Sequence, residues 1–302
     1  MKDLIPSRYG LSHYLTTATN CLLAKMRGML MPDKKNEAAE LRLVPMWPPR
    51  PSVHRSCLVF MRFQLMQLLT CSDGAIWSHH TLGSINLIKH RTPRRFDSDF
   101  DKALFVAHIG PIVFDCLLDH RPCYLAEPQW MEIYHSLVCD LNTLTERSLL
   151  ATSMRSQMIK LPDLWHDLNR TIRGSDLFNE EGQVSLLFRC FNARQQFLDW
   201  IEEYQSYCTR MSPVSPSPQE LALRRELYGT AIECLIVVKR LLETIIYTDE
   251  SLAIEAEVQA LAQSLLDLQK QPSPKHSWLF MGHEMGVTRS VLLTRHQWES
   301  PM

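Results

Sequence analysis

This sequence has little glycine: only 10 of its 302 residues, about 3%, against roughly 7% in globular proteins. Tight β-turns rely on glycine, and no segment alternates apolar and polar residues, so little favours a β-sheet. Apolar residues instead recur at steps of three and four, most clearly at Tyr228, Ala231, Leu235, Val238, Leu242 and Ile245. We therefore predict an all-α fold, an irregular multi-helix bundle of about nine or ten helices.

The chain also lacks a long apolar run and a regular cysteine pattern. Its best apolar run, residues 103–114, has about 12 residues, whereas a membrane-spanning helix needs roughly 20. The nine cysteines are odd in number and irregularly spaced, and none form a C-x-x-C pair. We therefore expect no membrane partner and no disulfide framework, and we expect the thiols to be reduced inside the cell.

Common catalytic and phosphate-binding motifs are missing as well. The sequence contains no G-x-G-x-x-G, no G-x-x-x-x-G-K-[ST] and no G-x-S-x-G. His283-Glu284 begins like a zinc-protease motif, but Val287 stands where the second histidine is needed. We predict that the chain is not an enzyme and has no catalytic residue, no cofactor-binding residue and no metal ligand.

Positive and negative charges are nearly equal in number, so the chain as a whole has no excess of positive charge with which to attract nucleic acid. Lys and Arg number 32, Asp and Glu number 33, and the formal net charge is −1. Domains that bind DNA through its phosphates usually have clearly more basic than acidic residues. We therefore expect no direct DNA contact from the bulk of this chain.

Residues 1–53 differ from the rest because they contain six prolines and no sustained apolar period. We predict a low-order N-terminal arm there; a transit peptide, which its early basic residues faintly resemble, is the less favoured alternative.

Residues 54–302 are predicted to be one all-helical domain. The expected helices cover 57–69, 75–89, 99–120 with Pro111 ending or kinking it, 127–147, a stretch to about 172 broken at Pro162, 184–208, 220–247, a helix through 254–268, and about 276–298. The expected core residues are Phe60, Leu69, Leu104, Ile109, Phe114, Trp130, Leu235, Val238, Leu242, Val258, Leu261 and Leu265.

One group of residues has the side chains that zinc prefers. Cys116, His120 and Cys123 lie at i, i+4 and i+7, so they would share one face of a continuous helix. Pro122 is expected to end that helix first, and no fourth ligand lies nearby in sequence. We favour buried cysteine packing with a helix-terminal histidine. His79 and His80 are likewise interpreted as structural.

Two short motifs have ordinary structural explanations. Residues 65–69 match L-x-x-L-L, which partners bind on an exposed helix, but their apolar flanks favour a core helix. The basic segment Lys89-His90-Arg91 with Arg94-Arg95 could serve nuclear import or contact phosphate, and we favour a solvated loop between helices.

A longer series of residues resembles the regulatory middle region of fungal zinc-cluster transcription factors. The series comprises Trp77, His80, Gly83, Leu87, Ile88, Arg91 and Pro93, then Ala103-Leu104-Phe105 and Gly110-Pro111, then Asp119 to Leu125, Pro128 and Trp130. Asp163-Leu164-Trp165, residues 253–266 and Trp278-Leu279-Phe280 continue it towards Trp298. The individual motifs are degenerate, so their order and spacing over residues 54–298 carry the resemblance.

The resemblance implies an all-helical regulatory domain of a nuclear transcription regulator that controls a metabolic gene set, with secondary metabolism as one option. It implies other transcription factors or co-regulators as partners, and a small effector as a further one. In that family, DNA is read by a separate N-terminal module of six cysteines around two zinc ions. Residues 1–53 contain only Cys21, so these residues do not build such a module. We expect DNA to be reached only through partners, unless a zinc-cluster module precedes this sequence.

Two other functions stay open as alternatives. The first is a helical enzyme or small-molecule-binding protein with an apolar pocket, for which His80, Asp115, His120 and Glu127 are the candidate acid–base groups. No spacing selects those four residues. The second alternative is a scaffold of stacked helices, which the stripes at 228–245 and 254–268 permit, although the lack of a repeat argues against a solenoid.

Overall fold

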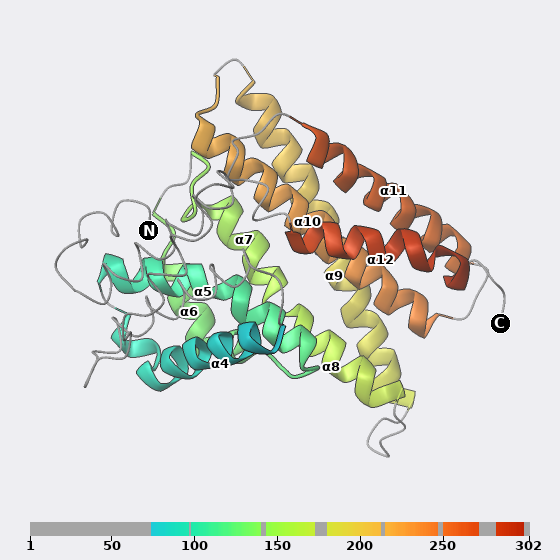
Figure 1. Ribbon diagram of the computed structural model, residues 1–302, viewed down its shortest axis with the longest axis horizontal. Helices are drawn as coiled ribbons and strands as arrows, with labels where there is room; N and C mark the ends of the chain where they lie inside the picture. The colour runs from blue at the N-terminus through green and yellow to red at the C-terminus, as the bar shows by residue number, and fades with distance from the viewer. Residues whose placement is uncertain are drawn as a thin grey trace, which may run out of the picture. The chain divides into compact units, whose positions relative to one another are not determined.

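A computed structural model describes residues 74–96, 98–139, 143–172, 180–212, 215–246, 250–271 and 282–298 (Figure 1). Most of the described residues are helical, and none of them forms a β-strand, so the predicted all-α class is confirmed. The predicted number of helices stays a prediction, as does the boundary at residue 53, which lies outside these ranges. No helix in the described ranges is long and apolar enough to cross a membrane.

The chain divides into two compact units, residues 1–115 and 116–302, which we describe separately. The first unit contains α4 (Gly74–Arg91), the 3-10 helix η3 (Pro93–Arg95) and most of α5 (Asp99–Leu118). Pro111 does not end α5, which continues for two more turns. The helix buries one face, formed by Leu104, Phe105, His108, Ile109 and Ile112.

The second unit continues with η4 (Tyr124–Ala126), α6 (Pro128–Ser136), α7 (Leu149–Met158), α8 (Leu161–Ile172), α9 (Glu180–Arg210), α10 (Pro218–Ile245), α11 (Glu250–Lys270) and α12 (Gly282–Trp298). Within this unit α10 lies between α9 and the pair α11 and α12 (Figure 1). Three apolar clusters of described residues lie around α10, which contributes to them through Leu235, Ala231 and Ile232. The clusters join α10 to α8 and α9, to α7 and α9, and to α11 and α12 respectively.

The predicted helix over residues 127–147 is wrong, because the chain leaves the helix after Ser136. Arg147 donates from Nε to the carbonyl oxygen of Leu137 at 2.8 Å, which closes the loop between α6 and α7. Ser148 then caps α7, since its hydroxyl accepts the backbone N–H of Ala151 at 3.3 Å. The break before α8 falls at Ile159–Lys160, and Pro162 occupies the first turn of α8, where a missing N–H costs nothing.

Most predicted core residues are buried. Those that the structure buries are Leu104, Ile109, Trp130, Leu235, Val238, Leu242, Val258 and Leu265. Leu261 is only partly buried, and Phe60 and Leu69 lie outside the described residues. The prediction for Phe114 is wrong, because its side chain is 38% exposed. At 100° per residue, Phe114 points away from the buried face of α5, since it follows Ile112 by two positions.

Candidate functional site

The turn after α5 meets the start of α8 in the second unit, and we call this contact the α5–α8 junction. The backbone N–H of Cys123 donates to Oδ1 of Asp163 at 2.9 Å. Trp165 donates from its indole Nε1 to Nδ1 of His120 at 2.5 Å, and the two rings stack with centroids 5.9 Å apart. His166 adds a hydrogen bond from Nδ1 to the carbonyl oxygen of His120 at 2.6 Å. Two segments about 40 residues apart in sequence are thereby held together.

The local sequence explains why the chain turns at this point. His120 has a φ of 51°, in the left-handed region where glycine is more usual. Its N–H donates to Leu117 O at 3.3 Å, and the next N–H, of Arg121, donates to Cys116 O at 3.0 Å. This pair of bonds is the Schellman arrangement that ends helices, and Pro122 prevents the helix from continuing. The contacts with Trp165 and His166 hold a non-glycine residue in this unfavourable conformation.

The described residues of the junction are not arranged as a metal site. A hydrogen bond with the Cys116 thiol, together with burial, raises the pKa of Cys123. His120 uses its ring nitrogen Nδ1 to accept from Trp165. No group of three or more His, Cys, Asp or Glu side chains in the described part of the chain is arranged to hold a metal ion.

Of the four candidate acid–base residues, the structure describes the side chains of Asp115, His120 and Glu127, and within the second unit His120 and Glu127 have separate hydrogen-bond partners. The side chain of His80 lies outside the described residues, as do those of His79, His283 and Glu284. Asp115 is buried on α5 in the first unit. Glu127 is exposed at the N-cap of α6, where it accepts from Gln129 Nε2 at 2.8 Å, while His120 serves the α5–α8 junction. No hydrogen bond or ion pair joins His120 to Glu127.

The basic segment is not the loop that we predicted, because Lys89, His90 and Arg91 form the last turn of α4 and Arg94 and Arg95 lie in η3. One of these arginines has a structural role. Arg91 donates from Nε and Nη2 to the carbonyl oxygen of Arg95, at 3.1 and 2.8 Å, and pairs with Asp101 at 2.8 Å. Its guanidinium also lies 5.3 Å from the centre of the Phe96 ring. Arg91 therefore connects the end of α4 to the start of α5. In this sequence, the arginine of the R-x-P pattern thus has a structural role. The L-x-x-L-L motif lies outside the described residues.

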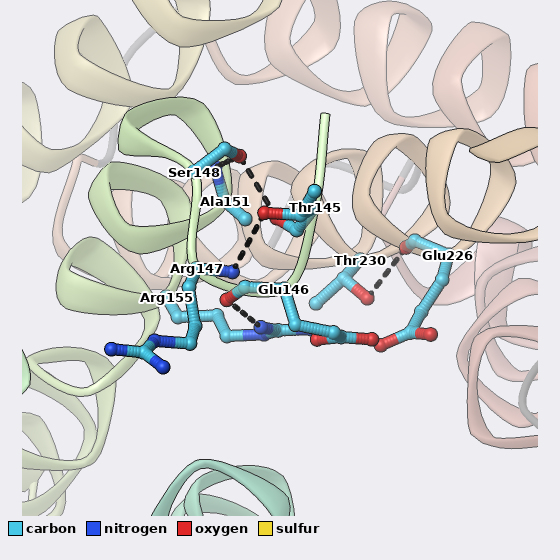
Figure 2. A network of polar contacts seen from close by, with 8 residues as sticks. All are labelled: Thr145, Glu146, Arg147, Ser148, Ala151, Arg155, Glu226 and Thr230. Atoms are coloured by element: carbon cyan, nitrogen blue, oxygen red, sulfur yellow. Dashed lines mark hydrogen bonds and ion pairs between the residues drawn. The ribbon is translucent and has the colours of Figure 1, made fainter. Parts of the chain in front are cut away.

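Sequence reasoning missed a buried arginine on α7. The side chain of Arg155 is only 9% exposed, and its Nη2 pairs with Glu146 Oε2 at 2.6 Å and with Glu226 Oε1 at 3.2 Å. Figure 2 shows Arg155 reaching the loop before α7 through Glu146 and α10 through Glu226. Burial alone would lower the pKa of Arg155, but the two carboxylates outweigh it and raise the pKa. No sequence signal links residues this far apart.

Comparisons with known proteins give limited information. The chain matches no protein-family model, and no solved structure matches it. It is similar to an uncharacterized protein, AN5342, of the fungus Emericella nidulans, with 25% identity over 97 residues. The match covers 31% of this chain and 21% of that protein, so this chain aligns with about one fifth of its relative. At this identity and coverage the match does not establish a family.

Proposed function

We propose that this chain is the helical regulatory region of a fungal-type transcription regulator. It acts in the nucleus on a metabolic gene set, through other transcription factors, co-regulators or a small effector, and reaches DNA only indirectly. Its helices, about nine or ten over residues 54–302, form the domain that presents the surface for these partners.

The α5–α8 junction is the observation that carries this proposal. The resemblance rests on the segment Asp119 to Leu125 and on Asp163-Leu164-Trp165, which are far apart in sequence. The structure joins them through the bond from Cys123 to Asp163 and the bond from Trp165 to His120. Motifs that belong to one domain are expected to meet in this way, whereas a chance series of residues has no reason to do so.

Two further observations agree with the proposal. The relative in Emericella nidulans is a fungal protein, as the resemblance requires. The formal net charge of −1 offers no general attraction for DNA phosphates, which fits a regulator that works through partners. No contact in the described residues favours the enzyme alternative, since His120 and Glu127 each have separate partners.

A tethering experiment tests the proposal without knowledge of the target genes. The full chain is fused to an unrelated DNA-binding domain, and transcription of a reporter bearing that domain's site is measured in a fungal host. We expect the fusion to raise or lower reporter output relative to the DNA-binding domain alone. An unchanged output from a well-expressed nuclear fusion would contradict the proposal.

Variants at the junction make the same assay sharper. Trp165→Ala removes both the stacking on His120 and the indole hydrogen bond, so it should reduce the effect on the reporter. Trp165→Phe keeps an aromatic ring but no donor, and it should fall between Trp165→Ala and the wild type. Gln205→Ala, at an exposed position on α9, serves as the control and should leave the effect unchanged.

A further inference from the structure

A threonine lies between the two parts of the basic segment in the first unit. Thr92 directly follows α4, and the next three residues, Pro93, Arg94 and Arg95, form η3. The side chains of Thr92, Arg94 and Arg95 are exposed, whereas Phe96, which ends the segment, is buried. The segment therefore presents a hydroxyl group, a proline and two arginines at the surface of the first unit.

The order of these residues fits the substrate pattern of one class of protein kinase. Proline-directed kinases of the cyclin-dependent kind accept proline directly after the phosphorylated residue, since proline has no N–H that the kinase groove must satisfy. They also favour a basic residue at the third position, an example of specificity through charge pattern. A serine or threonine precedes proline at Thr92, Ser212, Ser215, Ser217, Ser273 and Ser300. Among these, Thr92 is the one that the sequence follows with a lysine or arginine at the third position, Arg95.

The hydroxyl group of Thr92 is available for reaction. It does not cap η3, and it makes no hydrogen bond with any residue that the structure describes. Thr92 also has a φ of 61°, which is uncommon for a β-branched residue and marks the point where the chain leaves α4. By contrast, the hydroxyl oxygen of Ser217 accepts the N–H of Glu220 at 3.1 Å as the N-cap of α10. Thr92 thus differs from Ser217 in having no structural use for its hydroxyl.

The charges next to Thr92 can be recognised by a kinase and can pair with a phosphate. Neither Arg94 nor Arg95 makes a side-chain ion pair with any described residue, whereas Arg91 pairs with Asp101 at 2.8 Å. Arg95 is therefore free to meet a carboxylate in a kinase groove. A phosphate on Thr92 would add a charge of about −1.5 to −2 beside two unpaired guanidinium groups, with which it can form charge-assisted hydrogen bonds.

The segment can open locally so that a kinase binds it in an extended form. The 3-10 helix η3 is a single turn, held by the N–H of Arg95 to Thr92 O at 3.3 Å and the N–H of Phe96 to Pro93 O at 3.2 Å. The two bonds from Arg91 to the carbonyl oxygen of Arg95 are exposed to solvent. Few buried contacts are lost when such bonds open, so the free energy of opening is small. The more buried pair of Arg91 with Asp101 can stay in place.

We propose that Thr92 is a phosphorylation site of a proline-directed protein kinase that also recognises Arg95. The Thr92 Oγ1 attacks the γ-phosphorus of Mg²⁺-bound ATP, the bond from that phosphorus to the β–γ bridging oxygen breaks, the hydroxyl proton passes to the kinase, and ADP leaves. The phosphate offsets most of the positive charge of Arg94 and Arg95. Phosphorylation is thus a means of removing the attraction of the basic segment for anionic partners. This modification stands independently of the role in transcription.

Phosphorylation of the folded full chain by a purified cyclin-dependent kinase with its cyclin, Mg²⁺ and ATP tests the proposal. Tandem mass spectrometry locates each phosphate and follows its rate of appearance. We expect Thr92 to be phosphorylated faster than any of the serines that precede proline, which serve as comparison sites within the same chain. Thr92→Val keeps the shape of the side chain but has no hydroxyl, so it should lose this phosphate alone. The proposal is overturned if Thr92 is not phosphorylated, or if a serine that precedes proline reacts faster.

Three further variants test how the kinase recognises the segment. Arg95→Gln should slow phosphorylation of Thr92 about tenfold, the effect of one lost charge contact, whereas Arg94→Gln, at the second position, should change the rate by less than about twofold. Pro93→Ala should also slow the reaction at least about tenfold, because a proline-directed kinase reads this residue. Melting curves show that each variant is folded. Equal rates for Arg95→Gln and Arg94→Gln, or an unchanged rate for Pro93→Ala, would overturn the assignment to this class of kinase.

Discussion

The two units of the molecule bury an ionisable side chain in opposite ways. In the first unit His108 is fully buried on α5, where Nδ1 lies 2.8 Å from Leu104 O and Nε2 has no hydrogen-bond partner. Burial lowers the pKa of His108 to about 4, although the bond to Leu104 opposes the change. In the second unit Arg155 is almost as deeply buried, but Glu146 and Glu226 keep it charged.

The difference shows what a buried group needs in order to keep its charge. A backbone carbonyl alone does not offset the desolvation of an imidazolium, so His108 is neutral at pH 7. Two carboxylates offset the desolvation of a guanidinium, but each must be in place. The first unit is therefore expected to be sensitive to acid at His108, whereas the second is expected to be sensitive to loss of Arg155 or of either of its two carboxylate partners.

The largest expected effect comes from breaking the network in the second unit. Arg155→Ala removes two ion pairs of a buried guanidinium and leaves a cavity beside α7, so it should lower the free energy of unfolding by about 4 kcal/mol. Urea unfolding at pH 7, followed by circular dichroism, measures the loss. Arg189→Ala, which removes an exposed pair with Asp167, is the control and should cost below about 1 kcal/mol. Equal losses in the two variants would show that burial of Arg155 has no special effect.

The next effect concerns His108 and acid. The unfolded chain binds a proton at this residue near pH 6.5, whereas the folded chain does so only near pH 4. Stability that is fully present above pH 6.5 is therefore lost as the pH falls towards 4, up to about 3 kcal/mol. Urea unfolding between pH 7 and 4 measures this loss.

A matched variant isolates the contribution of His108. His108→Gln keeps a polar side chain of similar size but does not titrate, so its stability should fall less steeply between pH 6.5 and 4. The variant is expected to be less stable at pH 7, and only the slope against pH is compared. Parallel slopes for the wild type and His108→Gln would refute the assignment of the acid sensitivity to this residue.

A smaller effect is expected when one carboxylate of the network is neutralised. Glu226→Gln retains the shape and one acceptor oxygen, while Arg155 still pairs with Glu146. The free energy of unfolding should therefore fall by about 1–2 kcal/mol, less than in Arg155→Ala. The same urea titration checks the order of the two variants. A loss from Glu226→Gln as large as that from Arg155→Ala would mean that Glu146 contributes nothing.

The smallest effect is expected at the helix cap that starts the helix carrying Arg155. Ser148 accepts the N–H of Ala151, so Ser148→Ala should cost about 1 kcal/mol. Thermal melting at pH 7 measures the loss. The change should leave the response to pH unaltered, because Ser148 does not titrate. A change in the acid response would show that the two units are coupled in stability.

Long, regular helices could be predicted from the sequence because their apolar periods are local. The apolar stripe from Tyr228 to Ile245 led to a predicted helix over residues 220–247. The observed helix α10 differs from that range by two residues at each end. The same approach failed for residues 127–147, because the break depends on a bond from Arg147 to Leu137 and on the cap at Ser148. Phe114 was misplaced because apolar character alone does not say which face of α5 is buried.

The sites were less predictable because their partners are distant in sequence. Spacing alone grouped Cys116, His120 and Cys123, but the decisive neighbour of His120 is Trp165, 45 residues further along. Arg155 and Glu226 are 71 residues apart, and neither belongs to a motif.

The central claim is that this chain regulates transcription, and transcript profiling tests it most directly. The gene is deleted in its source organism, and RNA levels are compared with those of the parent strain and of a strain in which the gene is restored. Our account predicts a coherent change in a functionally related, metabolic set of genes that restoration reverses. The absence of any coherent and reversible change in transcripts would contradict it.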